Sequence, residues 1–394
     1  GNAIIDLLEA PGRVTAGSIR FMGEELRTMD ADQMRDVRGK RIGMIFQDPQ
    51  TSLNPLMTIG AQLVETIEKS TKLRGRGAYD HAVALLEQVG ITEAVARLRA
   101  YPHQFSGGMR QRVVIALALA GDPDLIIADE PTTALDVSIQ AQILDLIKSL
   151  CRERNLGVII VTHDIGVIAN IADRVAVMYN GEIVETGDVA QVLGAPKHVY
   201  TQSLIAAVPR ADTKLDRFTS VDYIEGNTAS FRRIDIQNHW LGKSQRHDHT
   251  GDAIEVSNLN LSFVLQKAML KRNRRMLKAV SDVNFTVQKG ETFGLVGESG
   301  SGKSTVARLI AGLYKPDSGQ VHVFGKDINQ NRKAPESRSA RQALQMIFQD
   351  PYSSLNARMR VLDIVAEPIR FYRLTDSEQE TRTIVGDLLE HVGL

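Results

Sequence analysis

Apolar residues follow a strand–helix–strand pattern in the middle of the chain. The runs LIIADEP (125–131) and GVIIVTHD (157–164) are short and bounded by polar or turn residues, which predicts two buried strands. Between them, DVSIQAQILDLIKSL (136–150) predicts a helix. Its apolar positions recur at helical spacing, at Ile139, Ile143, Leu146, Ile147 and Leu150. A strand, a crossover helix and a second strand predict parallel pairing, and therefore an α/β fold.

The pattern is duplicated within the chain. MIFQDP occupies residues 44–49 and returns at 346–351, 302 positions later. TAGSIRFMGEEL (15–26) resembles DSGQVHVFGKDI (317–328) at the same offset. LLEQVGI and LLEHVGL extend the collinear match. One period of this size predicts two homologous domains.

The two copies are separated by a segment of different composition. Residues 211–252 are polar and lack a clear hydrophobic period, so we expect a linker between a first domain at 1–210 and a second at 253–394. The linker's histidines, in NHW and HDHT, raise the alternative of a metal site. No cysteine accompanies them, and we interpret them as linker residues.

Composition excludes several classes of protein. Lysine plus arginine and aspartate plus glutamate both number 47, so no overall charge points to nucleic acid or an anionic membrane. Cys151 is the only cysteine, which excludes an intrachain disulfide and cysteine-rich metal sites and fits a reducing compartment. No apolar run approaches the roughly twenty residues of a membrane-spanning helix, and no signal peptide opens the chain. We therefore expect a cytoplasmic protein.

The segment VGESGSGKST (296–305) has the spacing of a phosphate-binding loop. It follows a strand-like run, TFGLV (292–296), and precedes a helix-like run, TVARLIAGL (305–313). In such loops backbone N–H groups surround the phosphates, the lysine reaches the β- and γ-phosphates, and the serine hydroxyl binds Mg²⁺. The candidate nucleotide-binding residues are Gly297, Glu298, Ser299, Gly300, Ser301, Gly302, Lys303, Ser304 and Thr305.

Polar residues follow both predicted parallel strands of the first copy. Asp129 is placed to hold Mg²⁺ through water, and Glu130 to orient or deprotonate a water molecule. Alternatively, both are solvated acids at a strand end. His163 ends the next strand, and a lone histidine there is usually structural. Because parallel strands bring their carboxyl ends to one edge, we expect His163 and Glu130 to be neighbours.

HQFSGGMRQRVVIALALA (103–120) predicts a long helix with Ser106 at its N-cap. An ordinary capped helix would suffice to explain it. However, Gly107 and Gly108 leave the first N–H groups accessible, which would form a site for a γ-phosphate.

Together these motifs resemble the ATP-binding cassette (ABC) ATPases, over nearly the whole chain. FSGGM is similar to the ABC signature, with Met109 where many members carry glutamine. The resemblance implies ATP and Mg²⁺ as ligands, and two P-loop domains in tandem, each a mixed sheet with a helical subdomain. It also implies site residues: Gln47 and Gln349 as Q-loop glutamines, Asp136 in the D-loop segment TALD, His163 as switch histidine, Glu130 as catalytic carboxylate, Ser304, Gln349 and Asp129 around Mg²⁺, and Phe263 stacked on adenine. Phe263 could instead be a core strand residue.

A narrower resemblance is to the oligopeptide/dipeptide importer ATPases of the fused, two-cassette type. It rests on IFQDPQTSLNP, YPHQFSGGMRQRV, ADEPTTALDVSIQAQIL and APKHVYTQSLIAAVP. It implies a peripheral protein on the cytoplasmic face of the bacterial inner membrane. Its partners would be two integral-membrane permease subunits, contacted through the helical insert at about 50–105 and its counterpart, and indirectly an extracytoplasmic substrate-binding protein. Members often carry a cysteine cluster after the first cassette; its absence here predicts no iron–sulfur cluster.

The alignment of the two copies predicts that the chain is truncated at both ends. The first copy lacks a phosphate loop, and the second lacks a signature, a carboxylate strand and a switch histidine. In the family, two cassettes sandwich ATP head to tail, with the loop of one facing the signature of the other.

Three functions remain open from the sequence. The first is the ATP-hydrolysing motor of a peptide or glutathione importer. The second is a tandem cassette acting on DNA or ribosomes, against which the single cysteine and the lack of basic arms argue. The third is a chain that binds ATP without hydrolysing it. The basic stretch QKAMLKRNRRMLK (266–278) could bind nucleic acid or membrane, but we expect a solvated hairpin and no nucleic-acid partner.

Overall fold

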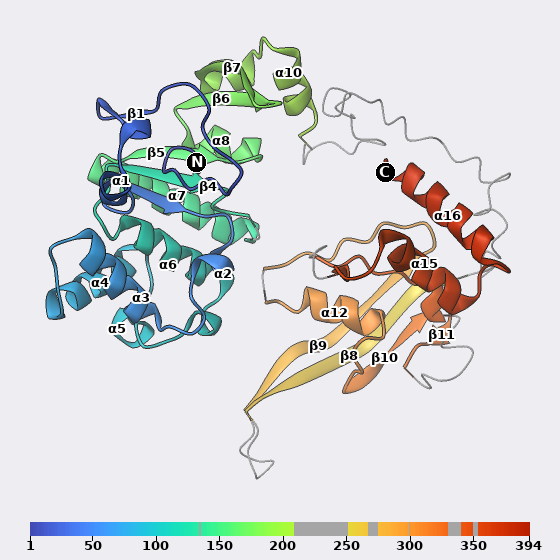
Figure 1. The fold of residues 1–394 in the computed structure, drawn as a ribbon. Helices are drawn as coiled ribbons and strands as arrows, with labels where there is room; N and C mark the ends of the chain where they lie inside the picture. Colours follow the sequence, from blue (N-terminus) through green and yellow to red (C-terminus); the bar gives the residue numbers. More distant parts are fainter. Residues whose placement is uncertain (134, 209–250, 267–274, 299, 330–339, 350–353) are drawn as a thin grey trace. The chain divides into compact units, whose positions relative to one another are not determined.

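The computed structural model of the chain describes residues 1–394 except 134, 209–250, 267–274, 299, 330–339 and 350–353 (Figure 1). Its contacts divide the chain into two compact units, Gly1–Ile224 and Glu225–Leu394. The predicted linker lies almost entirely outside the described residues, as do its histidines, so the domain boundaries stay predictions.

A parallel three-stranded sheet forms the centre of the first unit, in the order β3 (Ile42–Ile45), β4 (Leu125–Asp129) and β5 (Gly157–Val161). The predicted helix between the last two strands is α7 (Val137–Arg154). Its apolar stripe, together with α6 (Gly107–Leu119), joins the main hydrophobic core. The predicted strand–helix–strand crossover is therefore confirmed.

The segment after β3 folds as short helices, as the sequence predicts. Ile59, Leu63 and Ile67 lie at helical spacing on one face of α3 (Ile59–Ser70), and all three are fully buried. The helices are α2 (Pro49–Ser52), α3 (Ile59–Ser70), α4 (Arg76–Gln88) and α5 (Ala94–Arg97). Polar positions on the opposite face of α3 stay exposed, so this subdomain presents an outer surface.

The rest of the first unit surrounds this sheet with smaller elements. Two antiparallel pairs join strands that are close in sequence. These pairs are β1 (Arg20–Phe21) with β2 (Glu24–Glu25) and β6 (Arg174–Tyr179) with β7 (Glu182–Asp188). The remaining helices and 3₁₀ turns are η1 (Leu26–Thr28), α1 (Ala31–Val37), η2 (Pro102–Gln104), α8 (Ile165–Ile171), α9 (Val189–Gly194) and α10 (Val199–Ala206).

The second unit is built on an antiparallel sheet in the order β11 (Lys326–Asp327), β10 (Ser318–Val323), β8 (Asp252–Gln266), β9 (Arg275–Gln288). Strands β8 and β9 pair antiparallel as far as Gln266 and Arg275. Residues 267–274 of the basic stretch lie outside the described residues, so the solvated hairpin stays a prediction. Helix α12 (Lys303–Ile310) packs Val306 and Leu309 on this sheet.

Two helices complete the second unit, α15 (Val361–Tyr372) and α16 (Glu378–His391). Ala366 and Ile369 of α15 pack against Val385 of α16 in a small core of their own. Across the described part of the chain, no helix is both long and apolar enough to cross a bilayer.

One predicted strand is absent from the structure. Residues 292–296, TFGLV, are described without strand pairing, and Phe293, Leu295 and Val296 are all exposed. A strand needs a neighbour to satisfy its backbone groups. Within the described residues of the second unit, no parallel strand is available to this segment.

Candidate functional site

Glu130 and His163 lie together at the carboxyl edge of the parallel sheet. Asp129 of β4 pairs in register with Val161 of β5, so the residues that follow both strands emerge side by side. His163 Nδ1 lies 2.9 Å from Glu130 Oε1. The predicted proximity of these two side chains is confirmed.

The Glu130 carboxylate accepts three hydrogen bonds. Besides His163, Gln47 donates Nε2–H to Oε2 at 2.8 Å, and Thr133 donates its hydroxyl to the same oxygen at 2.8 Å. Thr133 appeared in the sequence only as the first residue of TALD, and no pattern marked it as a ligand of the carboxylate. Glu130 itself has φ +45°, a left-handed conformation that is strained for glutamate and is typical of functional sites.

These donors lower the pKa of Glu130 below its ordinary value. The bond from His163 has the largest effect, partial burial opposes it, and the bonds from Thr133 and Gln47 lower the pKa further. Glu130 is therefore ionised at neutral pH, ready to accept a hydrogen bond from water. A carboxylate with a low pKa is a weak base, so its first role in this geometry is to orient.

Removing the strongest donor should raise the pKa of Glu130. We expect His163→Ala to move it back toward the value of an unperturbed glutamate, measured by carboxyl ¹³C NMR titration. The pKa of Glu130 is lower in the folded protein than in the unfolded chain. Ionised Glu130 therefore stabilises the folded protein at pH values above the pKa of the unfolded chain, and this stabilisation is lost as the pH falls through the pKa of the folded protein. His103→Ala, at an exposed histidine stacked on Tyr101, is the control. An unchanged Glu130 titration in His163→Ala would contradict this account.

The residues predicted to form the signature and the D-loop lie at the starts of two adjacent helices, α6 and α7. Ser106 Oγ accepts a hydrogen bond from Met109 N at 3.3 Å, which confirms the predicted N-cap of α6. Asp136 Oδ1 accepts one from Ile139 N at 2.9 Å at the start of α7. A Cβ on Gly108 would lie 2.6 Å from Ile139 Cγ2. Gly108 therefore permits close packing of the two helix starts, and Gly107 precedes it on the accessible first turn.

The phosphate-loop motif curls around the start of α12. Gly297, Gly300 and Gly302 have φ of +155°, +83° and +98°, conformations that favour glycine. Lys303 Nζ donates to the carbonyls of Gly297 and Glu298, both at 2.6 Å, and lies 3.4 Å from Ser301 Oγ.

This loop fits a phosphate ligand. Its lysine ammonium already lies over the curled backbone, and the free N–H groups of the first turn of α12 follow directly. Ser304 and Thr305 belong to that first turn. Ser299 lies outside the described residues.

The predicted Mg²⁺ ligands come from different units. Ser304 and Gln349 belong to the second unit, where Gln349 is exposed, and Asp129 belongs to the first. In the described residues no group of three His, Cys, Asp or Glu side chains could alone hold a metal ion. Ser304 and Gln349 would supply a hydroxyl and an amide oxygen to Mg²⁺, and water and the nucleotide's phosphates would supply other ligands, as is usual for nucleotide sites.

Phe263 lies on β8 with 36% of its surface exposed. Its ring meets that of Tyr314 edge to face at 5.6 Å. The Phe263 ring is thus partly exposed and in contact with Tyr314. This position is compatible both with stacking on adenine and with packing in the core.

Comparisons with known proteins match both units. The family model described as "ABC transporter" covers residues 2–133 and 280–394, and "Oligopeptide/dipeptide transporter, C-terminal region" covers 184–237. The glutathione import ATP-binding protein GsiA of Escherichia coli strain K12 is 45% identical over 374 residues, 94% of this chain and 58% of that protein. Its counterpart in Salmonella choleraesuis strain SC-B67 is 45% identical over 376 residues with the same coverage. The chain thus spans little more than half the length of these relatives.

Among solved structures, a dimeric ATP-binding cassette with bound ADP and Pi is 30% identical. The match covers 44% of this chain and 74% of that one, with a TM-score of 0.41.

Proposed function

Because this chain belongs to the ABC transporter family, we propose that it is part of the ATP-hydrolysing motor of an importer for dipeptides, oligopeptides or glutathione-like substrates. The observation that carries the proposal is the Glu130 carboxylate, held by Gln47, Thr133 and His163 at the end of the Asp129 strand. The matches to the oligopeptide/dipeptide transporter region and to glutathione import proteins support the substrate class.

In this proposal the Glu130 site handles the attacking water. Bound Mg·ATP would supply the γ-phosphoryl group that water attacks. Ionised Glu130 accepts a hydrogen bond from that water, and Gln47 and His163 hold the carboxylate in place. The ring of His163 is largely exposed, so its other nitrogen, Nε2, could approach the negative charge that develops on the phosphoryl group. Asp129 would bind Mg²⁺ through water.

The second unit would bind the nucleotide through its own loop. The backbone N–H groups of residues 297–305 would surround the phosphates, and Lys303 would exchange its contacts with the loop carbonyls for the β- and γ-phosphates. Ser304 and Gln349 would reach Mg²⁺, and Phe263 would stack on adenine. The signature residues Ser106, Gly107, Gly108 and Met109 and the D-loop Asp136 would serve a facing cassette.

The proposed assembly places two cassettes, at 1–210 and 253–394, on the cytoplasmic face of the inner membrane beside two permease subunits. The test is to express the complete transporter, purify it through an affinity tag on this protein, and measure uptake of labelled glutathione and dipeptides. We expect two polytopic membrane proteins to copurify, with ATP-dependent uptake. Copurification with ribosomes or DNA instead would reject the proposal, and ATP binding without turnover would reject hydrolysis.

The adenine contact has its own test. Replacing Phe263 with alanine should weaken ATP binding by roughly 1–3 kcal/mol if the ring stacks on the base, taking base–aromatic stacking as the guide. Fluorescent ATP-analogue titration measures this, with Phe371→Ala as a control at an exposed ring on α15. If the folded Phe263→Ala protein binds the ATP analogue with unchanged affinity, Phe263 does not stack on adenine and its ring serves the packing against Tyr314 instead.

A further inference from the structure

The ring of Phe263 on β8 is held by a second aromatic ring. It meets Tyr314 edge to face, with the ring centroids 5.6 Å apart and the ring planes at 76°. Tyr314 lies just past the end of α12 and is partly buried against the hydrophobic core of the second unit. In such a contact the positive edge of one ring meets the negative face of the other, which favours one orientation of the pair. Tyr314 therefore restricts the plane in which the Phe263 ring lies.

Tyr314 is in turn fixed to the helix that begins at the phosphate loop. Arg308 of α12 donates Nη1–H to the Tyr314 hydroxyl oxygen at 3.3 Å, and its guanidinium carbon lies 5.9 Å from the centre of the tyrosine ring. A guanidinium at this distance from an aromatic ring is attracted to its face. The Tyr314 backbone N–H also donates to the carbonyl oxygen of Arg308 at 3.3 Å. Because Arg308 and Lys303 share α12, these contacts connect Phe263 to the element that carries the loop lysine.

The strand pair that carries Phe263 also lies against the loop. A Cβ on Gly302 would lie 2.3 Å from the carbonyl oxygen of Ala279 on β9. The next residue, Val280, pairs with Leu261 of β8. Phe263 follows Leu261 by two residues, about 7 Å along a strand. Phe263 is thus connected to the loop by two routes, one through the strand pair and one through Tyr314 and Arg308.

The internal repeat indicates that the turn after α12 does not itself require an aromatic ring. At the offset of 302 positions, the counterpart of Tyr314 is Gly12, which directly precedes the matching segment that begins in RVTAGSIR. Gly12 is exposed in the first unit. A tyrosine at this position of the second unit is therefore explained by its contacts with Phe263 and Arg308 and not by the backbone of the turn.

We propose that Tyr314 and Arg308 are positioning residues for the adenine-stacking ring of Phe263, and that they contribute to the preference of this site for a nucleotide over a bare polyphosphate. This rests on the proposed function, in which Phe263 stacks on adenine. The base and the phosphates of a nucleotide are covalently joined, so both gain affinity only when the loop and the stacking ring are held at matching positions. Tyr314 and Arg308 hold the ring relative to α12 before the nucleotide binds, which lowers the entropic cost of ordering it on binding.

The test compares the binding of Mg·ATP and of Mg·tripolyphosphate to the full chain by calorimetry. Tripolyphosphate can occupy the phosphate loop but has no base. We expect Tyr314→Leu to weaken ATP binding about 3- to 10-fold, within the worth of an edge-to-face ring pair, and to leave tripolyphosphate binding unchanged. Tyr314→Phe keeps the ring and should retain most of the preference for ATP. Arg308→Ala, at an exposed side chain, should lower the ATP affinity by a similar factor and again spare tripolyphosphate.

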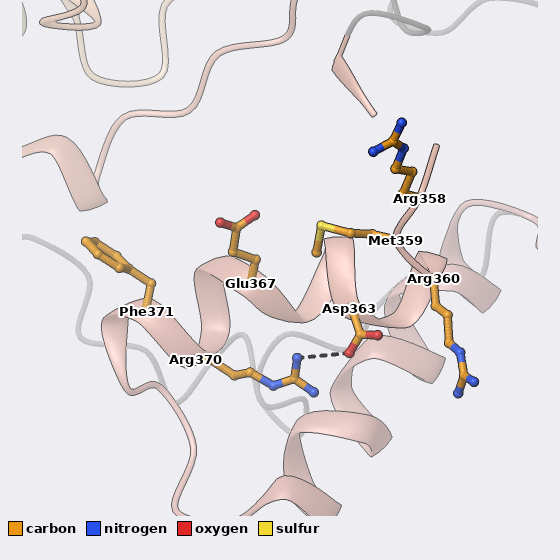
Figure 2. A pocket seen from close by; sticks show the side chains of 7 residues that line it. All are labelled: Arg358, Met359, Arg360, Asp363, Glu367, Arg370 and Phe371. Atoms are coloured by element: carbon orange, nitrogen blue, oxygen red, sulfur yellow. Dashed lines mark hydrogen bonds and ion pairs between the residues drawn. The ribbon is translucent and has the colours of Figure 1, made fainter. Parts of the chain in front are cut away.

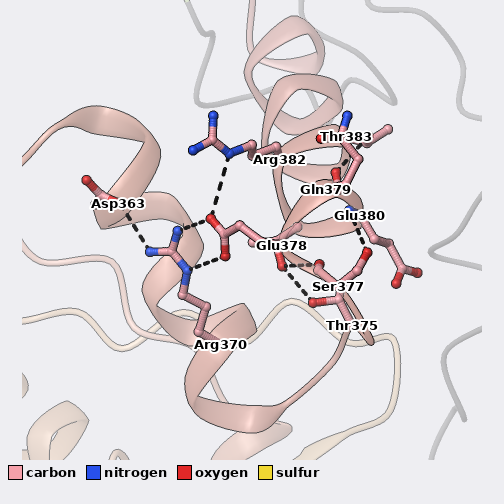
Figure 3. Close-up of polar contacts among 10 residues, drawn as sticks. Asp363, Arg370, Thr375, Ser377, Glu378, Gln379, Glu380, Arg382 and Thr383 are labelled. Atoms are coloured by element: carbon pink, nitrogen blue, oxygen red, sulfur yellow. Dashed lines mark hydrogen bonds and ion pairs between the residues drawn. The ribbon is translucent and has the colours of Figure 1, made fainter.

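Two matched controls come from α15 and α16, which pack in a small core of their own. Tyr372→Leu removes a tyrosine that meets Phe371 edge to face, with centroids 5.0 Å apart and planes at 84°. Figure 2 shows Phe371 on α15. Arg382→Ala removes an exposed arginine of α16 that pairs with Glu378 (Figure 3). Neither control should change the affinity for ATP or for tripolyphosphate.

The ratio of the two affinities separates the possible outcomes. If Phe263→Ala lowers the preference for ATP but Tyr314→Leu changes it less than threefold, adenine stacking stands and the positioning role is overturned. An equal loss of ATP and tripolyphosphate binding in Tyr314→Leu would also overturn it, because the ring would then support the fold of the whole unit. If Tyr314→Leu does not fold, Arg308→Ala decides by the same threshold. If Phe263→Ala itself leaves the ratio unchanged, the proposed adenine contact fails, and the positioning role fails with it.

Discussion

Replacing Glu130 with glutamine is expected to reduce ATP turnover at its site by roughly 10²–10⁴-fold, the usual contribution of a positioned acid–base group. The amide keeps the volume of the side chain but loses the negative charge and one of the two acceptor oxygens with which Glu130 would orient the water. In the wild-type protein Gln47, Thr133 and His163 all donate to the Glu130 carboxylate. In the variant the NH₂ group of the glutamine would face these donors in place of an acceptor oxygen. Nucleotide affinity should change little, because Glu130 acts on water.

Steady-state phosphate release by the complete transporter measures this effect. The comparison is made in a Lys303→Ala background, so that the loop of the second unit does not contribute turnover. Glu182→Gln, at an exposed position of β7, is the matched control. Turnover within about tenfold of the background protein would reject Glu130 as the principal catalytic carboxylate.

Gly302→Ala should weaken ATP binding at the loop by roughly 5- to 150-fold, since a strained backbone conformation costs about 1–3 kcal/mol. Gly302 has φ +98°, and an added Cβ would lie 2.3 Å from the carbonyl oxygen of Ala279. The backbone would have to move just where Lys303 begins α12. The N–H groups that face the phosphates would move with it.

Binding of a fluorescent ATP analogue to the full chain provides the measurement. Gly294→Ala is the matched glycine control, because its φ is not positive and no atom lies within 4 Å of the added Cβ. If both variants bind equally well, the loop does not require the conformation seen here, and the nucleotide site must lie elsewhere.

Local sequence alone determined several parts of this protein. The period of apolar residues at 136–150 predicted α7, and Ser106 predicted the start of α6, because periodicity and capping are set within a few residues. The proximity of Glu130 and His163 also followed from the sequence, since a crossover helix between parallel strands brings their ends to one edge. These features depend on spacing along the chain and on general rules of strand connection.

Tertiary structure decided whether an apolar run becomes a strand. The repeated MIFQDP places Ile45 in β3, fully buried against β4, whereas its counterpart Ile347 is 97% exposed and pairs with none of the strands that the structure describes. The six residues are identical, so their intrinsic preferences cannot account for the difference. The first unit supplies a neighbouring parallel strand, and the described part of the second does not. The neighbouring parallel strand supplies both the burial and the backbone hydrogen bonds, and six residues of sequence cannot show whether such a strand lies beside them.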